Sequence, residues 1–243
     1  MKIPTELLQR AASALQRAEP LTTPIYETTT FVFDSAEEVR DYNEGRSPKY
    51  LYSRYGNPTI SAVEQKLAKL ELAETAIVLS SGQAATTTAL LGLLSSGDEI
   101  VCSSAIYAGT LHLMTELLPK FGIRSRFVSV EDLRTPERIL SSETKLLWFE
   151  SPINPTLRCV DIAAVANACR SRGVISAIDN TFASPVNQQP LSLGIDIVMH
   201  SATKYLNGHS DVPAGVLAGR ASLLEPVQKA RKMFGTVVDP YAA

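Results

Sequence analysis

From Thr59 onward, short apolar runs alternate with helical patterns of about a dozen residues. Strands that alternate with helices in this way form βαβ units, in which the strands lie parallel. The runs are almost continuously apolar, as expected where helices cover both faces of a sheet. We therefore predict an α/β fold with three layers (αβα) around a mostly parallel sheet.

The positions of the elements follow from the apolar runs and the helical spacing. Strands are predicted at residues 76–80, 99–104, 123–130, 145–151, 174–179, 195–202 and 212–219. Helices are predicted at residues 59–72, 82–96, 110–122 and 161–173. The last two helices end at a glycine, which readily adopts the backbone conformation found just after a helix.

The first 58 residues follow another pattern. Residues 1–20 have the apolar spacing of an amphipathic helix, and residues 21–58 combine threonines, aromatics and prolines without a period. We predict an N-terminal helix followed by an extended arm, and an α/β domain over residues 59–235. The arm could cross onto a neighbouring subunit or wrap its own domain.

Charge and cysteine content exclude several classes of protein. Lys and Arg total 23 against 25 Asp and Glu, a balance that argues against a basic nucleic-acid binder. The three cysteines, Cys102, Cys159 and Cys169, are odd in number and widely spaced, unlike a disulfide framework or a zinc site. Residues 1–10 lack the apolar core of a signal peptide, and the apolar runs are too short to span a bilayer. We expect a cytoplasmic protein with no metal, nucleic-acid or membrane partner.

Reactive residues in a parallel sheet gather where its strands end. Ser81, Gly82 and Gln83 follow the first predicted strand and open a helix, whose N-terminus suits a phosphate. Tyr107 follows the second strand and could stack on a flat ring. Asn154 stands between two prolines that restrict its backbone. Each position also has an ordinary explanation: a helix cap, a half-buried tyrosine and a proline-rich loop.

Two further strands end in charged residues. Asp179 closes one buried run, where a carboxylate needs a partner. Lys204 follows the next run between Ser201, Thr203 and more polar residues; a desolvated lysine has a lowered pKa and forms Schiff bases. Together, a lysine, an aspartate, a stacking tyrosine and a phosphate-binding turn match the needs of pyridoxal 5′-phosphate (PLP).

Seven stretches carry a resemblance to a known family: residues 52–59, 80–85, 107–110, 150–155, 160–166, 177–185 and 200–211. In these stretches the chain resembles the Cys/Met-metabolism PLP-dependent enzymes of fold type I. That group includes cystathionine γ-synthase, cystathionine lyases, methionine γ-lyase and homoserine-ester sulfhydrylases. The resemblance implies a transsulfuration-type reaction, either β/γ-elimination or γ-replacement on sulfur amino acids or acylated homoserine.

The resemblance also implies roles for single residues around the cofactor ring. Lys204 would form the internal aldimine and move protons on the substrate. Asp179 would pair with the pyridine nitrogen, and Tyr107 would stack on the ring and assist the leaving group. Asn154 is similar to the family residue near the ring oxygen and the substrate carboxylate.

Phosphate binding is implied for a second group of residues. The turn of Ser81, Gly82 and Gln83 would offer backbone N–H groups, while Ser201 and Thr203 would offer hydroxyls.

The resemblance extends to subunit assembly. Tyr52 and Arg54 would reach the phosphate of the neighbouring subunit, so the expected assembly is a homotetramer built from two dimers. This favours the subunit-crossing arm. Residues 236–243 resemble the start of a C-terminal domain that carries the arginine for the substrate α-carboxylate, so the chain is expected to lack that domain.

Two details bear on the reaction. Methionine γ-lyases have in common a cysteine at the position that Gly109 occupies in this chain. Residues 207–211 look more like the corresponding residues of the cystathionine enzymes. A cystathionine γ-synthase or γ-lyase is therefore favoured, with methionine γ-lyase or O-acylhomoserine sulfhydrylase as alternatives. The alternative that is not an enzyme is a catalytically inactive PLP-binding fragment or an interaction domain.

Overall fold

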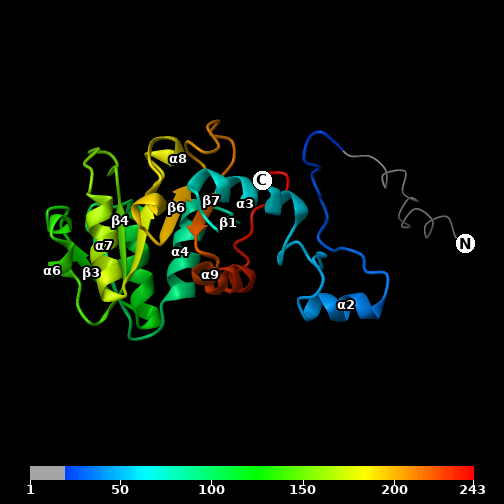
Figure 1. Ribbon diagram of the computed structural model, residues 1–243, viewed down its shortest axis with the longest axis horizontal. Helices are drawn as coiled ribbons and strands as arrows, with labels where there is room; N and C mark the ends of the chain where they lie inside the picture. The colour runs from blue at the N-terminus through cyan, green and yellow to red at the C-terminus, as the bar shows by residue number, and fades with distance from the viewer. Residues whose placement is uncertain (1–19) are drawn as a thin grey trace, which may run out of the picture.

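The chain forms a seven-stranded sheet with helices on both faces (Figure 1). The structure, a computed structural model, describes residues 20–243, so nearly all of the helix predicted for residues 1–20 lies outside it. The strands are β1 (Thr75–Leu79), β2 (Glu99–Ser103), β3 (Arg124–Val128), β4 (Thr144–Glu150), β5 (Ile175–Asp179), β6 (Ile197–Ser201) and β7 (Gly215–Gly219). The α-helices are α2 (Ala36–Asn43), α3 (Pro58–Glu71), α4 (Gly82–Leu93), α5 (Ala108–His112), α6 (Pro136–Ile139), α7 (Ile162–Arg172), α8 (Ser184–Asn187) and α9 (Ala221–Phe234).

The sheet has the order β1-β7-β6-β5-β4-β2-β3. Strand β7 runs antiparallel to both β1 and β6, and the other neighbouring pairs are parallel. The prediction of a mostly parallel, three-layer α/β fold is confirmed, and each predicted strand lies within three residues of an observed one. None of the helices in residues 20–243 is both long and apolar enough to cross a bilayer.

Strand β4 shows how the two faces of the sheet are buried. Leu146 and Trp148 lie in the core beneath α4 and α9, whereas Leu147 and Phe149 lie in the core beneath α6 and α7. Successive side chains of a strand point to opposite faces. An apolar run with no polar alternation therefore fills both cores, as the sequence predicts.

Residues 20–57 lead away from the layered domain, and the helix α2 lies at their far side (Figure 1). An extended arm was expected here, and within it the chain forms the short helix α2, which the sequence analysis did not predict. The helix begins at Ser35, whose hydroxyl accepts the Glu38 N–H at 3.2 Å, while the Glu38 carboxylate accepts the Asp34 N–H at 2.9 Å. This reciprocal cap stabilises a helix that buries no residue.

Other helices also differ from the sequence prediction: the short helices α6 and α8 were not predicted, and two longer segments depart from it. The segment expected as one helix at 110–122 consists of α5, a π-helical turn at Leu113–Leu117 and a 3-10 turn at Leu118–Phe121. Helix α9 was not predicted, because Pro226 interrupts its pattern. Leu224 and Val227 of α9 are buried in the core beneath α4, and this packing outweighs the cost of the proline.

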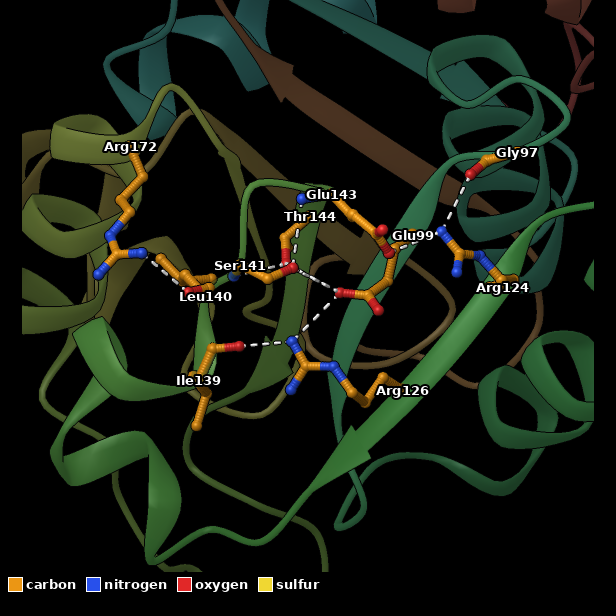
Figure 2. Close-up of polar contacts among 10 residues, drawn as sticks. All are labelled: Gly97, Glu99, Arg124, Arg126, Ile139, Leu140, Ser141, Glu143, Thr144 and Arg172. Atoms are coloured by element: carbon orange, nitrogen blue, oxygen red, sulfur yellow. Dashed lines mark hydrogen bonds and ion pairs between the residues drawn. The ribbon is translucent and has the colours of Figure 1, made fainter.

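A polar cluster joins the edge strand β3 to the loop before β4 (Figure 2). One oxygen of the Glu99 carboxylate accepts hydrogen bonds from Arg126 at 3.1 Å, Thr144 at 2.9 Å and Ser141 at 3.4 Å. Arg126 also donates to the Ile139 carbonyl. Burial alone would raise the pKa of Glu99, but these donors outweigh burial and lower it. The cluster lies at the edge of the sheet where β2 and β4 begin, opposite the predicted site.

We expect Glu99→Gln to lower the free energy of unfolding by ~1–3 kcal/mol at neutral pH, because Arg126, Ser141 and the buried Thr144 lose a charged acceptor. A carboxylate with a lowered folded pKa stabilises the protein fully above its unfolded pKa, near 4.5 here. The difference between wild type and variant should therefore shrink as the pH falls through the folded pKa. Urea unfolding at pH 7 and pH 3.5 measures this.

The matched control is Glu143→Gln, which removes an exposed carboxylate paired with Arg124 in the same region. An exposed pair of this kind contributes ~0.2–1 kcal/mol. Equal losses in the two variants would contradict the role given to Glu99.

Candidate functional site

Five strands bring the predicted site residues to one edge of the sheet. Their carboxyl ends lead into the turn after β1, the loops after β2 and β4, and the turns after β5 and β6. Each of these five segments contacts at least one of the others through a hydrogen bond or a close approach of atoms. The residues Ser81, Gly82, Gln83, Tyr107, Asn154, Asp179 and Ser201 therefore lie together at this edge of the sheet.

The turn after β1 is shaped to receive an anion. Ser81 caps α4 by accepting the Ala84 N–H at 3.0 Å, while the N–H groups of Gly82 and Gln83 have no acceptor within residues 20–243. A Cβ atom on Gly82 would lie 2.9 Å from the Ser201 Oγ, so only glycine permits this approach. Two free N–H groups, a hydroxyl and the positive end of a twelve-residue helix thus converge.

Asp179 is buried at the end of β5, and only one of its oxygens is used. Its Oδ1 accepts the N–H of Thr181 at 3.0 Å and the Thr181 hydroxyl at 2.5 Å. Among the described residues, no hydrogen bond reaches Oδ2. Burial raises the pKa of Asp179, because the charged form loses water. A cation placed at Oδ2 would offset that cost.

Thr181 was missed by the sequence analysis. Its hydroxyl donates to Asp179 and accepts the Ser201 N–H at 2.7 Å, so it connects the turns after β5 and β6. A hydroxyl two residues after a buried aspartate is a common local arrangement. The two-residue spacing between Asp179 and Thr181 was therefore the sequence signal that could have identified Thr181.

Tyr107 is held beside the turn after β1. The Gln83 side chain donates to the Gly109 carbonyl at 3.2 Å, and a Cβ on Gly109 would lie 2.6 Å from the Tyr107 ring and 2.7 Å from the Gln83 amide oxygen. That amide oxygen is buried and has no hydrogen-bond partner among residues 20–243. Tyr107 is exposed, with 58% of the residue's surface accessible.

Glu150 was also missed, although it ends a buried strand just as Asp179 does. Its two oxygens accept the backbone N–H groups of Tyr107 at 3.0 Å and Asn154 at 2.8 Å. Burial, with a contribution from Asp179, raises the pKa of Glu150 to about 7.

Lys204 and Thr203 differ from the sequence expectation. The Lys204 side chain is exposed at the turn after β6, so the described residues do not desolvate it as expected. The turn itself is ordered, since the Lys204 N–H donates to the Ser201 carbonyl at 3.1 Å. The Thr203 hydroxyl faces the backbone of Ala214, donating to its carbonyl at 3.2 Å and accepting its N–H at 3.0 Å.

Tyr52 and Arg54 lie apart from the other predicted residues. Both line a hollow of about 400 Å³ between the arm and residues 237–240, and no other predicted site residue lines it. Arg54 donates to the Lys232 carbonyl at 2.7 Å, near the end of α9, and lies over the Tyr55 ring. Within one chain, these two residues do not join the site.

Comparisons with known proteins agree with this geometry. A family model described as "Cys/Met metabolism PLP-dependent enzyme" matches residues 5–243. The chain is 40% identical over 226 residues to a protein named cystathionine gamma-synthase 1, chloroplastic, from Arabidopsis thaliana; the match covers 93% of this chain and 40% of that protein. It is 38% identical over 225 residues to L-methionine gamma-lyase of Pseudomonas putida, covering 92% of this chain and 56% of that protein.

A solved structure is also similar. The structure titled as metB from Corynebacterium glutamicum superimposes with a TM-score of 0.85 at 37% sequence identity, covering 92% of this chain and 56% of that one. The chain thus spans about half the length of the curated relatives it matches.

Proposed function

The chain belongs to the Cys/Met-metabolism family of PLP-dependent enzymes, and we propose that it supplies the PLP-binding site of a transsulfuration enzyme. The reaction class is β/γ-elimination or γ-replacement on sulfur amino acids or acylated homoserine. The observation that carries the proposal is the single sheet edge that gathers an anion-binding turn, a buried carboxylate with a free oxygen and an exposed lysine.

The residues present fit the cofactor. The N–H groups of Gly82 and Gln83, with the Ser201 hydroxyl, would hold the phosphate. Asp179 would bind the protonated ring nitrogen through Oδ2. The positive charge of that nitrogen would offset the unfavourable free energy of burying this carboxylate. When bound, PLP supplies an electron sink for charge that develops at the substrate α-carbon.

Further roles follow for Lys204, Tyr107 and Asn154. Lys204 would bind the cofactor covalently through its amine and then move a proton at the α-carbon. Tyr107 would stack on the ring and hold a proton for the leaving group. Asn154 would orient the ring oxygen and the substrate carboxylate. Ser81 and Thr203 would shape the phosphate site, Ser81 by capping α4 and Thr203 by fixing its turn on Ala214.

Within the family, we favour a cystathionine γ-synthase or γ-lyase reaction. Gly109 leaves no side chain between Tyr107 and Gln83, and relatives named cystathionine gamma-synthase match this chain at 39–40% identity. Relatives named L-methionine gamma-lyase match almost as well, at 36–39%, so that activity remains the second candidate.

The arm supports a proposal of a shared site. Residues 20–31 and the helix α2 are mostly exposed in the single chain, and Tyr52 and Arg54 lie at the base of this arm. We propose that the arm crosses to a second copy, where Tyr52 and Arg54 reach the phosphate, in a dimer or a homotetramer of two dimers.

The absorption spectrum of the purified protein with PLP tests the proposed function. We expect a visible band, and borohydride reduction should fix the cofactor on the peptide that contains Lys204. Elimination is then assayed with cystathionine and with methionine, by the 2-oxo acid released, and γ-replacement is assayed with an acylated homoserine plus cysteine, by the cystathionine formed. A folded protein without the visible band would overturn the proposal, and a band without turnover in either the elimination or the replacement assay would favour a non-catalytic PLP-binding domain.

Gly109→Ala is expected to weaken PLP binding by about tenfold or less. The added Cβ would lie 2.6 Å from the Tyr107 ring, so the ring must move away from its stacking position. An aromatic stack contributes ~0.5–1.5 kcal/mol, and 1.4 kcal/mol corresponds to tenfold in affinity. A PLP titration measures the change, and an unchanged dissociation constant would contradict the stacking role of Tyr107.

A further inference from the structure

Glu150 joins two loops that carry proposed contacts to the cofactor ring. It is the last residue of β4 and is 5% exposed. One carboxylate oxygen accepts the N–H of Tyr107 in the loop after β2, and the other accepts the N–H of Asn154 in the loop after β4. Both oxygens therefore bind main chain, and the carboxylate fixes the spacing of these loops.

The charged form of the Glu150 carboxyl is energetically unfavourable at this position. Glu150 lies directly opposite Asp179 in the parallel pair β4–β5, so the two side chains share one face of the sheet. The buried Cys102 thiol on β2 is a further neighbouring titratable group, and within residues 20–243 no salt bridge reaches the Glu150 carboxylate. Burial and Asp179 raise its pKa to about 7.

The two N–H groups explain why a carboxylate is needed. A glutamine of the same shape offers one acceptor oxygen, and its NH2 group would face the second N–H donor. An apolar residue would leave both N–H groups unpaired in a buried region. Only a carboxylate satisfies both loops at once.

We propose that Glu150 is a positioning residue that holds Tyr107 and Asn154 in place over the cofactor ring. The proposal rests on the proposed PLP site, since it concerns how two loops present their side chains to that ring. Glu150 acts through the backbones of its neighbours and does not itself touch the cofactor.

Amide hydrogen exchange of the cofactor-free protein tests the hold on the loops. In Glu150→Ala, the amides of Tyr107 and Asn154 should both exchange about two- to tenfold faster, because each loses one hydrogen bond of ordinary strength, ~0.5–1.5 kcal/mol. In Glu150→Gln, only one of the two should do so. Amides within β4, such as that of Trp148, serve as the internal reference and should keep their wild-type rates.

Ligand binding tests the consequence for the site. In Glu150→Ala, the dissociation constant of PLP should rise by about tenfold, whereas that of inorganic phosphate should stay within about twofold, because the phosphate contacts lie on other loops. Glu99→Gln is the matched control: it removes a buried carboxylate at the opposite end of the strands and should alter neither dissociation constant.

Three results would overturn the proposal: unchanged exchange at Tyr107 and Asn154, faster exchange throughout β4, or equal weakening of PLP and phosphate binding. If the wild-type protein binds no PLP, the proposed function fails, and the exchange rates still decide whether Glu150 holds the loops. Glu150→Gln keeps the test available if Glu150→Ala does not fold.

Discussion

Lys204→Ala is expected to remove the covalent attachment of PLP and to lower turnover by at least ~10²–10⁴-fold, the contribution of a positioned proton-transfer group. The fold should be unaffected, because the Lys204 side chain is exposed and its turn is held by backbone hydrogen bonds. An exposed substitution of this kind changes stability by about 0.5 kcal/mol or less. The visible spectrum, turnover and thermal unfolding measure the three effects.

Lys204→Arg tests whether the reaction needs the positive charge of Lys204 or the reactivity of its amine. Arginine keeps the positive charge but stays protonated, so it can neither form a Schiff base nor act as a base. We expect it to fail as completely as alanine. Lys145→Ala, an exposed lysine where β4 begins at the opposite edge of the sheet, is the matched control and should retain the wild-type spectrum and rate. A Lys204→Arg protein with normal turnover would show that another residue carries the reaction.

The sequence predicted the fold well wherever burial alone decides the structure. The sheet is covered on both faces, so each strand had to be an apolar run, and Leu146 to Phe149 fill both cores. The prediction of helices failed where a helix depends on local capping or on packing against residues far away in the sequence. Helix α2 is stabilised by the reciprocal cap of Ser35 and Glu38, and α9 tolerates Pro226 because Val227 packs in the core beneath α4.

The same distinction holds for the site. Asp179, Ser201 and Gly82 could be found because they follow strands, and the ends of strands meet by topology. The hydrogen bonds that organise them could not be found in this way. Glu150 binds two backbone groups in separate loops, and Thr181 bridges two turns, so their roles depend on three-dimensional distances.

Arg231→Met is expected to lower the free energy of unfolding by ~3–5 kcal/mol, the cost of breaking a buried ion pair. Arg231 is 2% exposed and donates to the Glu64 carboxylate at 2.7 Å. For a chain of this size the melting temperature should fall by roughly 6–20 °C. Differential scanning calorimetry and urea unfolding measure the loss, and Lys229→Met, an exposed lysine of α9, should stay within ~0.5 kcal/mol of wild type.

The loss should grow as the pH rises. Burial already raises the pKa of Glu64 in spite of its pairing with Arg231. Without the arginine, the folded protein must keep this carboxyl protonated, whereas the unfolded chain releases the proton above about pH 4.5. The unfolded state is then favoured progressively as the pH rises above that value, so the variant should be closest to wild type at or below about pH 4.5.

The position of the pair on the sheet explains why apolar residues cannot simply replace it. Strand β1 is an edge strand, and the outward N–H and C=O of Val78 are bound by Glu64 at 3.0 Å and Arg231 at 3.1 Å. The pair thus takes the place of a neighbouring strand. Glu64→Leu with Arg231→Met removes the uncompensated charge but leaves both Val78 groups unpaired, at ~1–3 kcal/mol each. Glu64→Gln with Arg231→Met keeps an acceptor and should be the more stable double variant; an apolar pair as stable as wild type would show that the pair has no role at the edge.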